Sequence, residues 1–167
     1  MKTYTINKIE ELEQFKDGTG YYIYIDGNLI ANCNLDFSGS LYVKGYLKTS
    51  QSIETEYFIE AGKDIKAEGS IKTGGSIKAG GSIEAKGFIK SGWSVKADEY
   101  IKSGEFIQAN WFIEAGEYIK AGRYIKAGGY IKAGRVIEAE GFIKASKYIE
   151  ADGGILAGFY ITCKERA

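Results

Sequence analysis

One isoleucine recurs every six residues along most of this chain. The series runs from Ile53 to Ile161 and is interrupted only by Val95. Two residues after almost every member stands a small residue, usually alanine. A period of six fits neither the 3.6-residue helix nor a hairpin sheet, but it suits a chain that makes a short strand, turns a corner and repeats. The pattern therefore predicts an all-β, single-domain β-solenoid.

The repeating unit indicates how each strand and corner is built. Residues 119–124 read Ile-Lys-Ala-Gly-Arg-Tyr, and Ile119 and Ala121 are two apart, so on a strand both point inward while Lys120 points to water. Gly122 is expected to open the corner with a positive φ, which costs a glycine little. Three units per turn predict a triangular prism of about 18 residues per coil and about eight coils.

The repeat also divides the chain. Its phase extends upstream to Ile23. We therefore expect an N-terminal helical cap over 1–20, the β-solenoid over 21–163 and a short C-terminal tail over 164–167. Within the cap, Asn7 is the predicted N-cap, Glu10 follows three residues later, and the apolar face is formed by Ile9, Leu12 and Phe15. Such a helix would cover the open end of a solenoid.

Composition excludes several function classes. Lys plus Arg and Asp plus Glu are equal at 22 each, so no global field attracts nucleic acid or membranes. The chain has no histidine, which is the commonest general base and metal ligand, and we expect neither an enzyme nor a cofactor. Without an apolar run of membrane-spanning length, a soluble cytoplasmic protein is expected. Cys163 occupies an alanine slot and is predicted to be a buried free thiol, far from Cys33.

With 18 residues per coil, outward side chains stack into columns, and one column differs from the others. Between Lys72 and Lys144, four of its five members are lysines and none is acidic, whereas the other two columns mix both signs. Aromatic residues precede the isoleucines on the same face, and two tryptophans fall at the next corner. The predicted partner-binding residues are Lys72, Lys90, Lys126, Lys144, Phe106, Tyr124, Phe142, Trp93 and Trp111. An acidic protein surface, a single-stranded nucleic acid and a purely structural ladder all remain open as explanations.

The last units of the array are unusually apolar on the outside. Leu156 and Thr162 replace the charged outward residue of the repeat. Apolar character at a terminal coil favours pairing with another surface. We therefore predict a homodimer through the C-terminal coil, formed by Leu156, Phe159, Tyr160 and Thr162.

The segments Ala79-Gly80-Gly81-Ser82-Ile83 and Ala85-Lys86-Gly87-Phe88-Ile89 resemble the hexapeptide repeat of left-handed β-helices. In that family the small residue precedes the large aliphatic one, whereas here isoleucine comes first, so the handedness stays open. The array also resembles the bactofilins, which polymerise end to end, and the repetitive Gly-Ser-Ile-Lys-Ala solenoids encoded by phages and mobile elements.

The phage resemblance implies a non-enzymatic inhibitor that binds and blocks a host defence complex, such as a CRISPR effector, in the host cytoplasm. The bactofilin resemblance implies instead a self-assembling structural protein of cytoskeletal type. A helical cap at one end argues against a filament, because it would seal one of the two surfaces that a filament needs.

Overall fold

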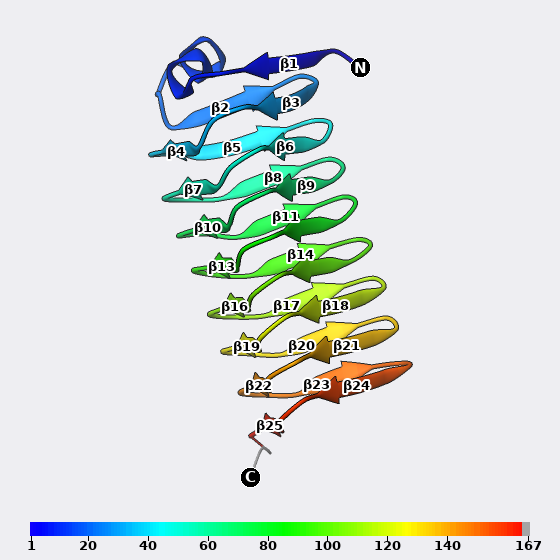
Figure 1. Ribbon diagram of the computed structural model, residues 1–167. Coiled ribbons are helices and arrows are strands. Elements are labelled where there is room, and N and C mark those ends of the chain that lie inside the picture. Colours follow the sequence, from blue (N-terminus) through cyan, green and yellow to red (C-terminus); the bar gives the residue numbers. More distant parts are fainter. Residues whose placement is uncertain (165–167) are drawn as a thin grey trace.

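The structure is a computed structural model that describes residues 1–164, and it forms one solenoid of stacked coils (Figure 1). Three parallel sheets run along the solenoid. Sheet A contains β1 (Thr3–Ile6), β3 (Asn28–Ala31), β6 (Leu47–Thr49), β9 (Ile65–Ala67), β12 (Ile83–Ala85), β15 (Ile101–Ser103), β18 (Tyr118–Ala121), β21 (Val136–Ala139) and β24 (Gly154–Ala157). Sheet B contains β2 (Tyr22–Ile25), β5 (Ser40–Val43), β8 (Ile59–Ala61), β11 (Ile77–Ala79), β14 (Val95–Ala97), β17 (Ile113–Ala115), β20 (Ile131–Ala133) and β23 (Ile149–Ala151). Sheet C contains β4 (Leu35–Phe37), β7 (Ile53–Thr55), β10 (Ile71–Thr73), β13 (Ile89–Ser91), β16 (Ile107–Ala109), β19 (Ile125–Ala127), β22 (Ile143–Ala145) and β25 (Ile161–Cys163).

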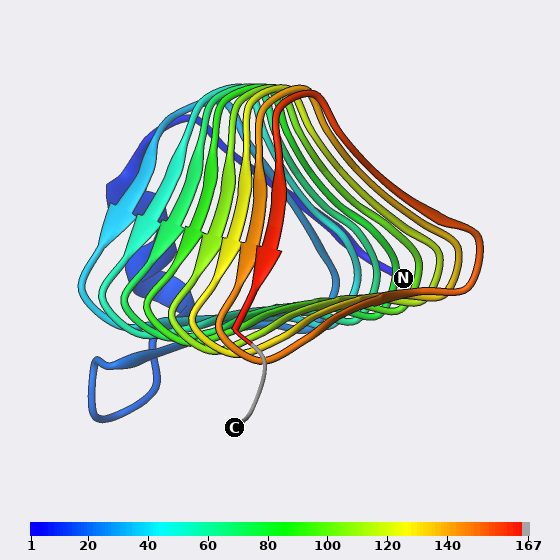
Figure 2. The same ribbon diagram turned by 90° about the horizontal axis from the view of Figure 1, so that it is seen from below.

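The strands pair in the register that the sequence predicts. Ile89 pairs with Ile71 on one side and with Ile107 on the other, so one coil takes 18 residues. Viewed along its axis, the solenoid has three sides that meet at rounded corners (Figure 2). The predicted all-β solenoid of about eight coils is therefore confirmed.

The core consists of the repeat's large and small inward positions. The isoleucines of the central coils are fully buried, and the alanines two residues later are almost as well buried. Where serine or threonine takes the small slot, its hydroxyl donates a hydrogen bond to a corner carbonyl of the preceding coil. Ser91 Oγ lies 2.6 Å from the Gly75 oxygen, and Ser103 Oγ lies 2.8 Å from the Gly87 oxygen. Buried polar atoms are thus satisfied without interrupting the core.

The corner glycines are needed for a different reason from the one expected. Gly122 does not adopt a positive φ, and among residues 1–164 only Gly20 and Gly39 do so. Instead, a Cβ added at Gly122 would fall inside van der Waals contact with the Gly104 carbonyl oxygen of the coil before it. At Gly122 the preceding coil therefore lies so close that a Cβ has no room.

The N-terminal end is covered by a helix and an additional strand. The helix η1 (Ile9–Phe15) is a 3-10 helix whose N-cap is Lys8, so the prediction of Asn7 as N-cap was wrong by one residue. Glu11, not Glu10, accepts the backbone N–H groups of Asn7 and Lys8, at 3.2 and 3.1 Å. The N-cap and the carboxylate are still three residues apart, as predicted, but the helix starts one residue later than predicted.

The apolar face predicted for this helix does cover the end of the core. Leu12 is buried, while Ile9 and Phe15 pack against the buried cluster. Phe15 meets Tyr4 edge to face, with ring centroids 5.0 Å apart. Tyr4 belongs to β1, which adds an outermost strand to sheet A and was not predicted, because it lies outside the six-residue register.

The other end of the solenoid is open within the described residues. The strands β23, β24 and β25 are the last strands of sheets B, A and C. Ile161 is 44% exposed, whereas Ile143 in the coil before it is fully buried. Cys163 is an exposed free thiol rather than the predicted buried one, because nothing in residues 1–164 covers the outer side of β25. Of the predicted tail 164–167, residues 165–167 lie outside the described part of the chain.

Candidate binding surface

The predicted lysine column lies on the outer face of sheet C. Successive strands pair Lys72 with Lys90, Gln108 with Lys126, and Lys126 with Lys144. These side chains occupy the outward position between a buried isoleucine and a buried small residue, and all four lysines are exposed. The structure therefore brings Lys72, Lys90, Lys126 and Lys144 into one row, as the sequence predicted.

The lysines of this row differ from those of the other two faces in their ion pairs. On sheet B, Lys96 bonds Glu114 and Lys132 bonds Glu150, both at 2.8 Å, each across one coil. On sheet A, Lys120 lies 2.9 Å from Glu138. On sheet C, Lys72 pairs with Glu54 of the preceding coil, but none of the ion pairs within residues 1–164 includes Lys90, Lys126 or Lys144. Sheet C thus presents positive charge that this part of the chain does not neutralise.

A continuous aromatic ladder runs beside the lysine row. Its rings stack nearly parallel, with centroids 4.9 Å apart for Phe106 on Tyr124 and 4.8 Å apart for Tyr124 on Phe142. Each ring precedes the isoleucine of a sheet C strand, two residues before the outward residue, which is a lysine or glutamine in every strand except the last, where it is Thr162. The full ladder consists of Phe88, Phe106, Tyr124, Phe142 and Tyr160.

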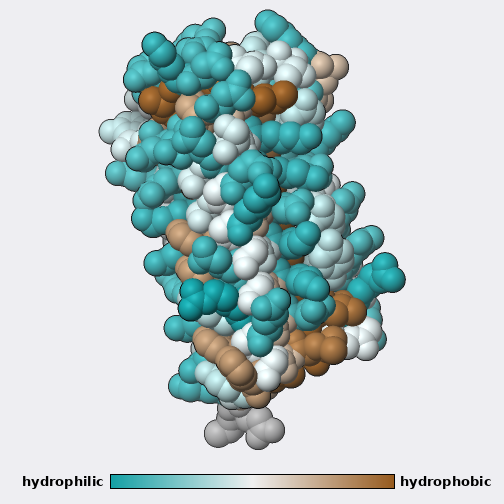
Figure 3. All heavy atoms as spheres, in the orientation of Figure 1, coloured by the Kyte–Doolittle hydropathy of each residue, from teal (hydrophilic) through white to brown (hydrophobic). Residues whose placement is uncertain are grey.

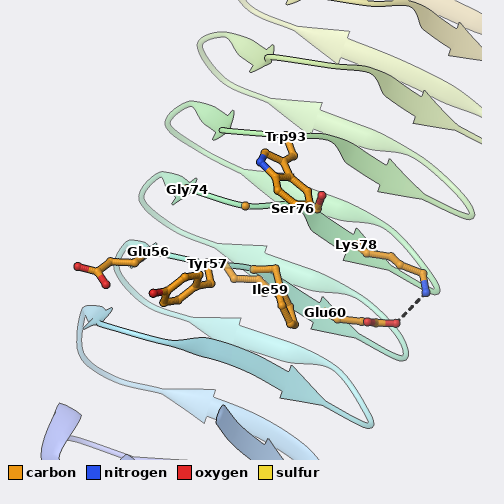
Figure 4. A pocket seen from close by; sticks show the side chains of 10 residues that line it. Glu56, Tyr57, Ile59, Glu60, Gly74, Ser76, Lys78 and Trp93 are labelled. Carbon is orange, nitrogen blue, oxygen red and sulfur yellow. Dashed lines mark hydrogen bonds and ion pairs between the residues drawn. The ribbon is translucent and has the colours of Figure 1, made fainter. Parts of the chain in front are cut away.

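The two predicted tryptophans lie at the corner between sheets C and B. Trp93 and Trp111 stack on each other at 5.8 Å, and they are 59% and 62% exposed. Trp93 lines a pocket together with Glu60 and Lys78, which are outward residues of sheet B (Figure 4). The tryptophans thus stand at the corner that the sequence predicted, two residues before a sheet B strand begins, and Trp93 lies beside outward residues of that sheet.

This pocket was not found by sequence reasoning. Its volume is about 630 Å³, and its floor is the ringless corner formed by Gly74, Gly75 and Ser76. The ion pair between Lys78 Nζ and Glu60 Oε1, 2.7 Å long, closes one end and raises the pKa of Lys78. The absence of an aromatic residue at Ser76 was visible in the sequence, but the walls of the pocket come from neighbouring coils.

The residues predicted for dimerisation gather on the last coil. Leu156 is 57% exposed and Phe159 is 81% exposed, and Tyr160 and Thr162 are also exposed. Brown apolar side chains are visible at this lower end of the molecule in Figure 3. All four residues lie on the last coil, with Leu156 on the outer face of sheet A and Thr162 on the outer face of sheet C.

Two hydrogen-bonded groups on sheet B and its corner, Tyr130 and Glu114, have shifted pKa values. The most strongly shifted is Tyr130, where burial, together with a 2.9 Å hydrogen bond to Glu114, raises the pKa to about 12. Glu114 in turn has a lowered pKa, mainly because Lys96 donates a hydrogen bond to it. Within residues 1–164 there is no cluster of three or more His, Cys, Asp or Glu side chains that could hold a metal ion.

No helix among residues 1–164 has the length and apolar character needed to cross a membrane. Comparison of the chain with models of protein families, with curated proteins and with solved structures finds no match.

Proposed function

We propose that this protein is a non-enzymatic binding protein that attaches to an acidic protein surface through the outer face of sheet C. The observation that carries the proposal is the row of Lys90, Lys126 and Lys144, which lacks ion pairs within residues 1–164 and lies beside a stacked aromatic ladder. Like charges one coil apart destabilise a sheet. Sheets A and B also contain such lysine neighbours, but there each lysine of the pairs Lys78–Lys96 and Lys102–Lys120 has an ion pair with a glutamate. A row of lysines whose mutual repulsion opposes folding is explained if a partner neutralises their charge.

The arrangement favours a protein partner over a nucleic acid. A single strand stacks its bases on exposed ring faces, but the ladder rings on sheet C already stack on one another. What the ladder offers to a partner is a strip of ring edges beside exposed ammonium groups. Aromatic and basic residues in such a combination dominate the binding energy of protein interfaces. The chain's net charge of zero also provides no general attraction for polyanions.

The biological setting we propose is that of a phage or prophage inhibitor that blocks a host defence complex, such as a CRISPR effector. The support for this setting is the repeat itself, which resembles the repeats of solenoids encoded by phages and mobile elements. A rigid solenoid with a charged lateral face is suited to this task, because its surface loses little conformational freedom on binding.

The test is binding to a purified CRISPR effector complex, measured by co-elution and by inhibition of DNA cleavage. The variant Lys90→Glu, Lys126→Glu, Lys144→Glu should lose both activities. The matched control is Lys2→Glu, Lys48→Glu, Lys63→Glu, which has the same charge change away from the sheet C face, on residues that also form no ion pair within the described chain. Equal loss in both variants, or in neither, would refute the role of the lysine row.

A second candidate function is self-assembly, favoured by the exposed last coil. A structural protein of bactofilin type would stack end to end, but η1 and β1 cover the opposite end, so we propose a closed homodimer through Leu156, Phe159, Tyr160 and Thr162. Light scattering over a range of concentrations separates the outcomes. A mass that stops at two chains supports the dimer, and a mass that keeps growing supports the filament. A monomer at all concentrations contradicts both.

A further inference from the structure

The last coil of the solenoid exposes the whole cross-section of the core. Ile149, Ile155 and Ile161 are the last isoleucines of sheets B, A and C, and none of them is buried, with Ile161 at 44% exposure. The isoleucines one coil earlier are fully buried in all three sheets. The strands β23, β24 and β25 also have a free edge, since no later strand in residues 1–164 pairs with them. A cover for this end must therefore fill the core and pair with three strand edges.

The free edge of β24 presents the backbone groups of its inward residues. In earlier coils, Ile131 donates its N–H to the Tyr148 carbonyl of the next coil at 3.1 Å, so an inward residue directs its backbone groups toward the coil that follows. On β24 the inward residues are Ile155 and Ala157. The backbone groups of the outward Leu156 point the other way, toward the preceding coil, because these directions alternate along a strand.

The three last strands form a staircase around the axis of the solenoid. They follow one another in the order β23, β24 and β25, so each lies one-third of a coil further along the axis than the one before, and β25 is the outermost (Figure 1). A twofold axis perpendicular to the solenoid reverses the strand of one sheet and exchanges the strands of the other two. Three such axes exist, and they differ in which steps of the two staircases meet.

Only one of these axes brings two copies together at one strand spacing on every sheet. If the middle step, β24, pairs with its own copy at ~4.8 Å, the high step β25 meets the low step β23 of the other copy at ~4.8 Å as well. Self-pairing of β23 would place β24 of one copy and β25 of the other at the same height, where they collide. Self-pairing of β25 would leave a space one strand wide on sheets A and B. The shape of the end therefore selects β24.

The side chains of β24 suit pairing with their own copy. In the register that aligns the two short strands, Ile155 of one chain lies opposite Ala157 of the other, so the free backbone groups pair and a large inward side chain meets a small one. Leu156 then lies opposite Leu156 of the copy, on the outer face. This outward residue is charged in every sheet A strand from β6 to β21. A charge at position 156 would face an identical charge across the axis, which leucine avoids.

The same register matches β25 with β23 of the copy. Ile161 lies opposite Ala151 inside the core, which again places a large residue against a small one. Thr162 lies opposite Glu150 on the outer face, so no like charges meet there. All three sheets then continue from one copy into the other, and the isoleucines of the last coil are covered.

We infer that the C-terminal coil binds a second copy of this chain about a twofold axis through β24, with β24 antiparallel to its own copy and β25 antiparallel to β23 of the other copy. The inference rests on the proposed homodimer and adds which strands join and in which register. Phe159, 81% exposed at the corner between β24 and β25, would lie opposite Gly153, which has no side chain to obstruct the ring. Each copy keeps its cap of η1 and β1 at the far end, so the assembly stops at two chains.

The experiment is cysteine cross-linking of the full chain with Cys33 and Cys163 replaced by alanine, after light scattering has measured its mass. Leu156→Cys should form a covalent dimer on mild oxidation, because the two cysteines would be directly opposed with Cα atoms about 4.5 Å apart. Thr162→Cys and Glu150→Cys should each remain uncross-linked alone and should cross-link when combined in one chain. The matched control is Glu138→Cys, on the same face one coil from the interface, which should not cross-link.

A lysine at each position gives a second readout that needs no cysteine. Leu156→Lys should weaken dimerisation at least about tenfold, because each new ammonium group faces its own copy. Thr162→Lys places the ammonium group opposite Glu150 of the copy, so its dissociation constant should stay within about threefold of the wild-type value. Sedimentation equilibrium measures both constants.

Three results would overturn the inference. Cross-linking of Thr162→Cys alone, or equal weakening by the two lysine variants, would assign the axis to a strand other than β24. A dimer in light scattering in which Leu156→Cys cross-links no better than Glu138→Cys would remove this arrangement and leave the homodimer standing. A monomer at all concentrations would remove both, and neither result depends on whether the lysine row of sheet C binds a partner.

Discussion

The isoleucine column of sheet C predicts a large difference in stability between two identical substitutions. Ile107 is fully buried between Ile89 and Ile125, while Ile161 at the end of the same column is 44% exposed. Ile→Ala removes three carbons, worth ~2.4 kcal/mol when they are fully buried. At Ile107 the cavity between two fixed neighbours adds to this, so we expect a loss of about 3–5 kcal/mol.

At Ile161 the expected loss is smaller for two reasons. Only about half of the side chain is removed from water, which reduces the transfer term to ~1.3 kcal/mol. The missing side chain also leaves an open edge rather than an enclosed cavity, so no further cavity cost applies. Fraying of the last coil would lower the measured loss still further, because each coil is stabilised mainly by its neighbours.

The assay is urea unfolding followed by circular dichroism, carried out at low and high protein concentration. Comparison of the m-values shows whether the same amount of structure unfolds in each variant. Equal losses for Ile107→Ala and Ile161→Ala at every concentration would refute the reasoning from burial. A loss at Ile161 that grows with concentration would instead show that a second chain covers this coil, as the proposed dimer requires.

Three further predictions concern charge, corner packing and pH. At low salt, Lys126→Glu should raise the melting temperature because its neighbour Lys144 has no ion pair within the described chain, whereas Lys132→Glu should lower it because its neighbours are Glu114 and Glu150. In about 1 M NaCl the difference between the two variants should vanish. A difference that persists at high salt would contradict an electrostatic origin. Gly92→Ala should destabilise by ~3 kcal/mol, because a Cβ there would collide with the Gly74 carbonyl, while Gly18→Ala, which has open space, should be nearly neutral in the same urea assay. The folded state raises the pKa of Tyr130 to about 12, so the neutral phenol stabilises the fold fully below the ordinary pKa of 10.0, and this contribution is lost as pH rises from 10.0 towards about 12. Across that range the wild type should lose more stability than Tyr130→Phe. Parallel curves of stability against pH for the two proteins would contradict the assignment.

The sequence by itself determined the architecture and the composition of the lysine row. A period of six sets which side chains point inward, and alternation along a strand is a local property of the backbone. Once three units close a coil, residues eighteen apart must stack, so the row from Lys72 to Lys144 and the ladder from Phe88 to Tyr160 followed from counting. The apolar face of the N-terminal helix also followed from spacing alone.

Only the tertiary structure decided the features that depend on contacts between coils and on the ends of the stack. The added strand β1 and the exposure of Cys163 result from which coil is outermost, and a repeat pattern does not encode that. Gly92 and Gly122 lack room for a Cβ because of the carbonyls of the preceding coil, not because of their own φ angles. The pocket lined by Tyr57, Phe58 and Trp93 is formed by side chains of neighbouring coils, and packing in three dimensions decides how these side chains lie.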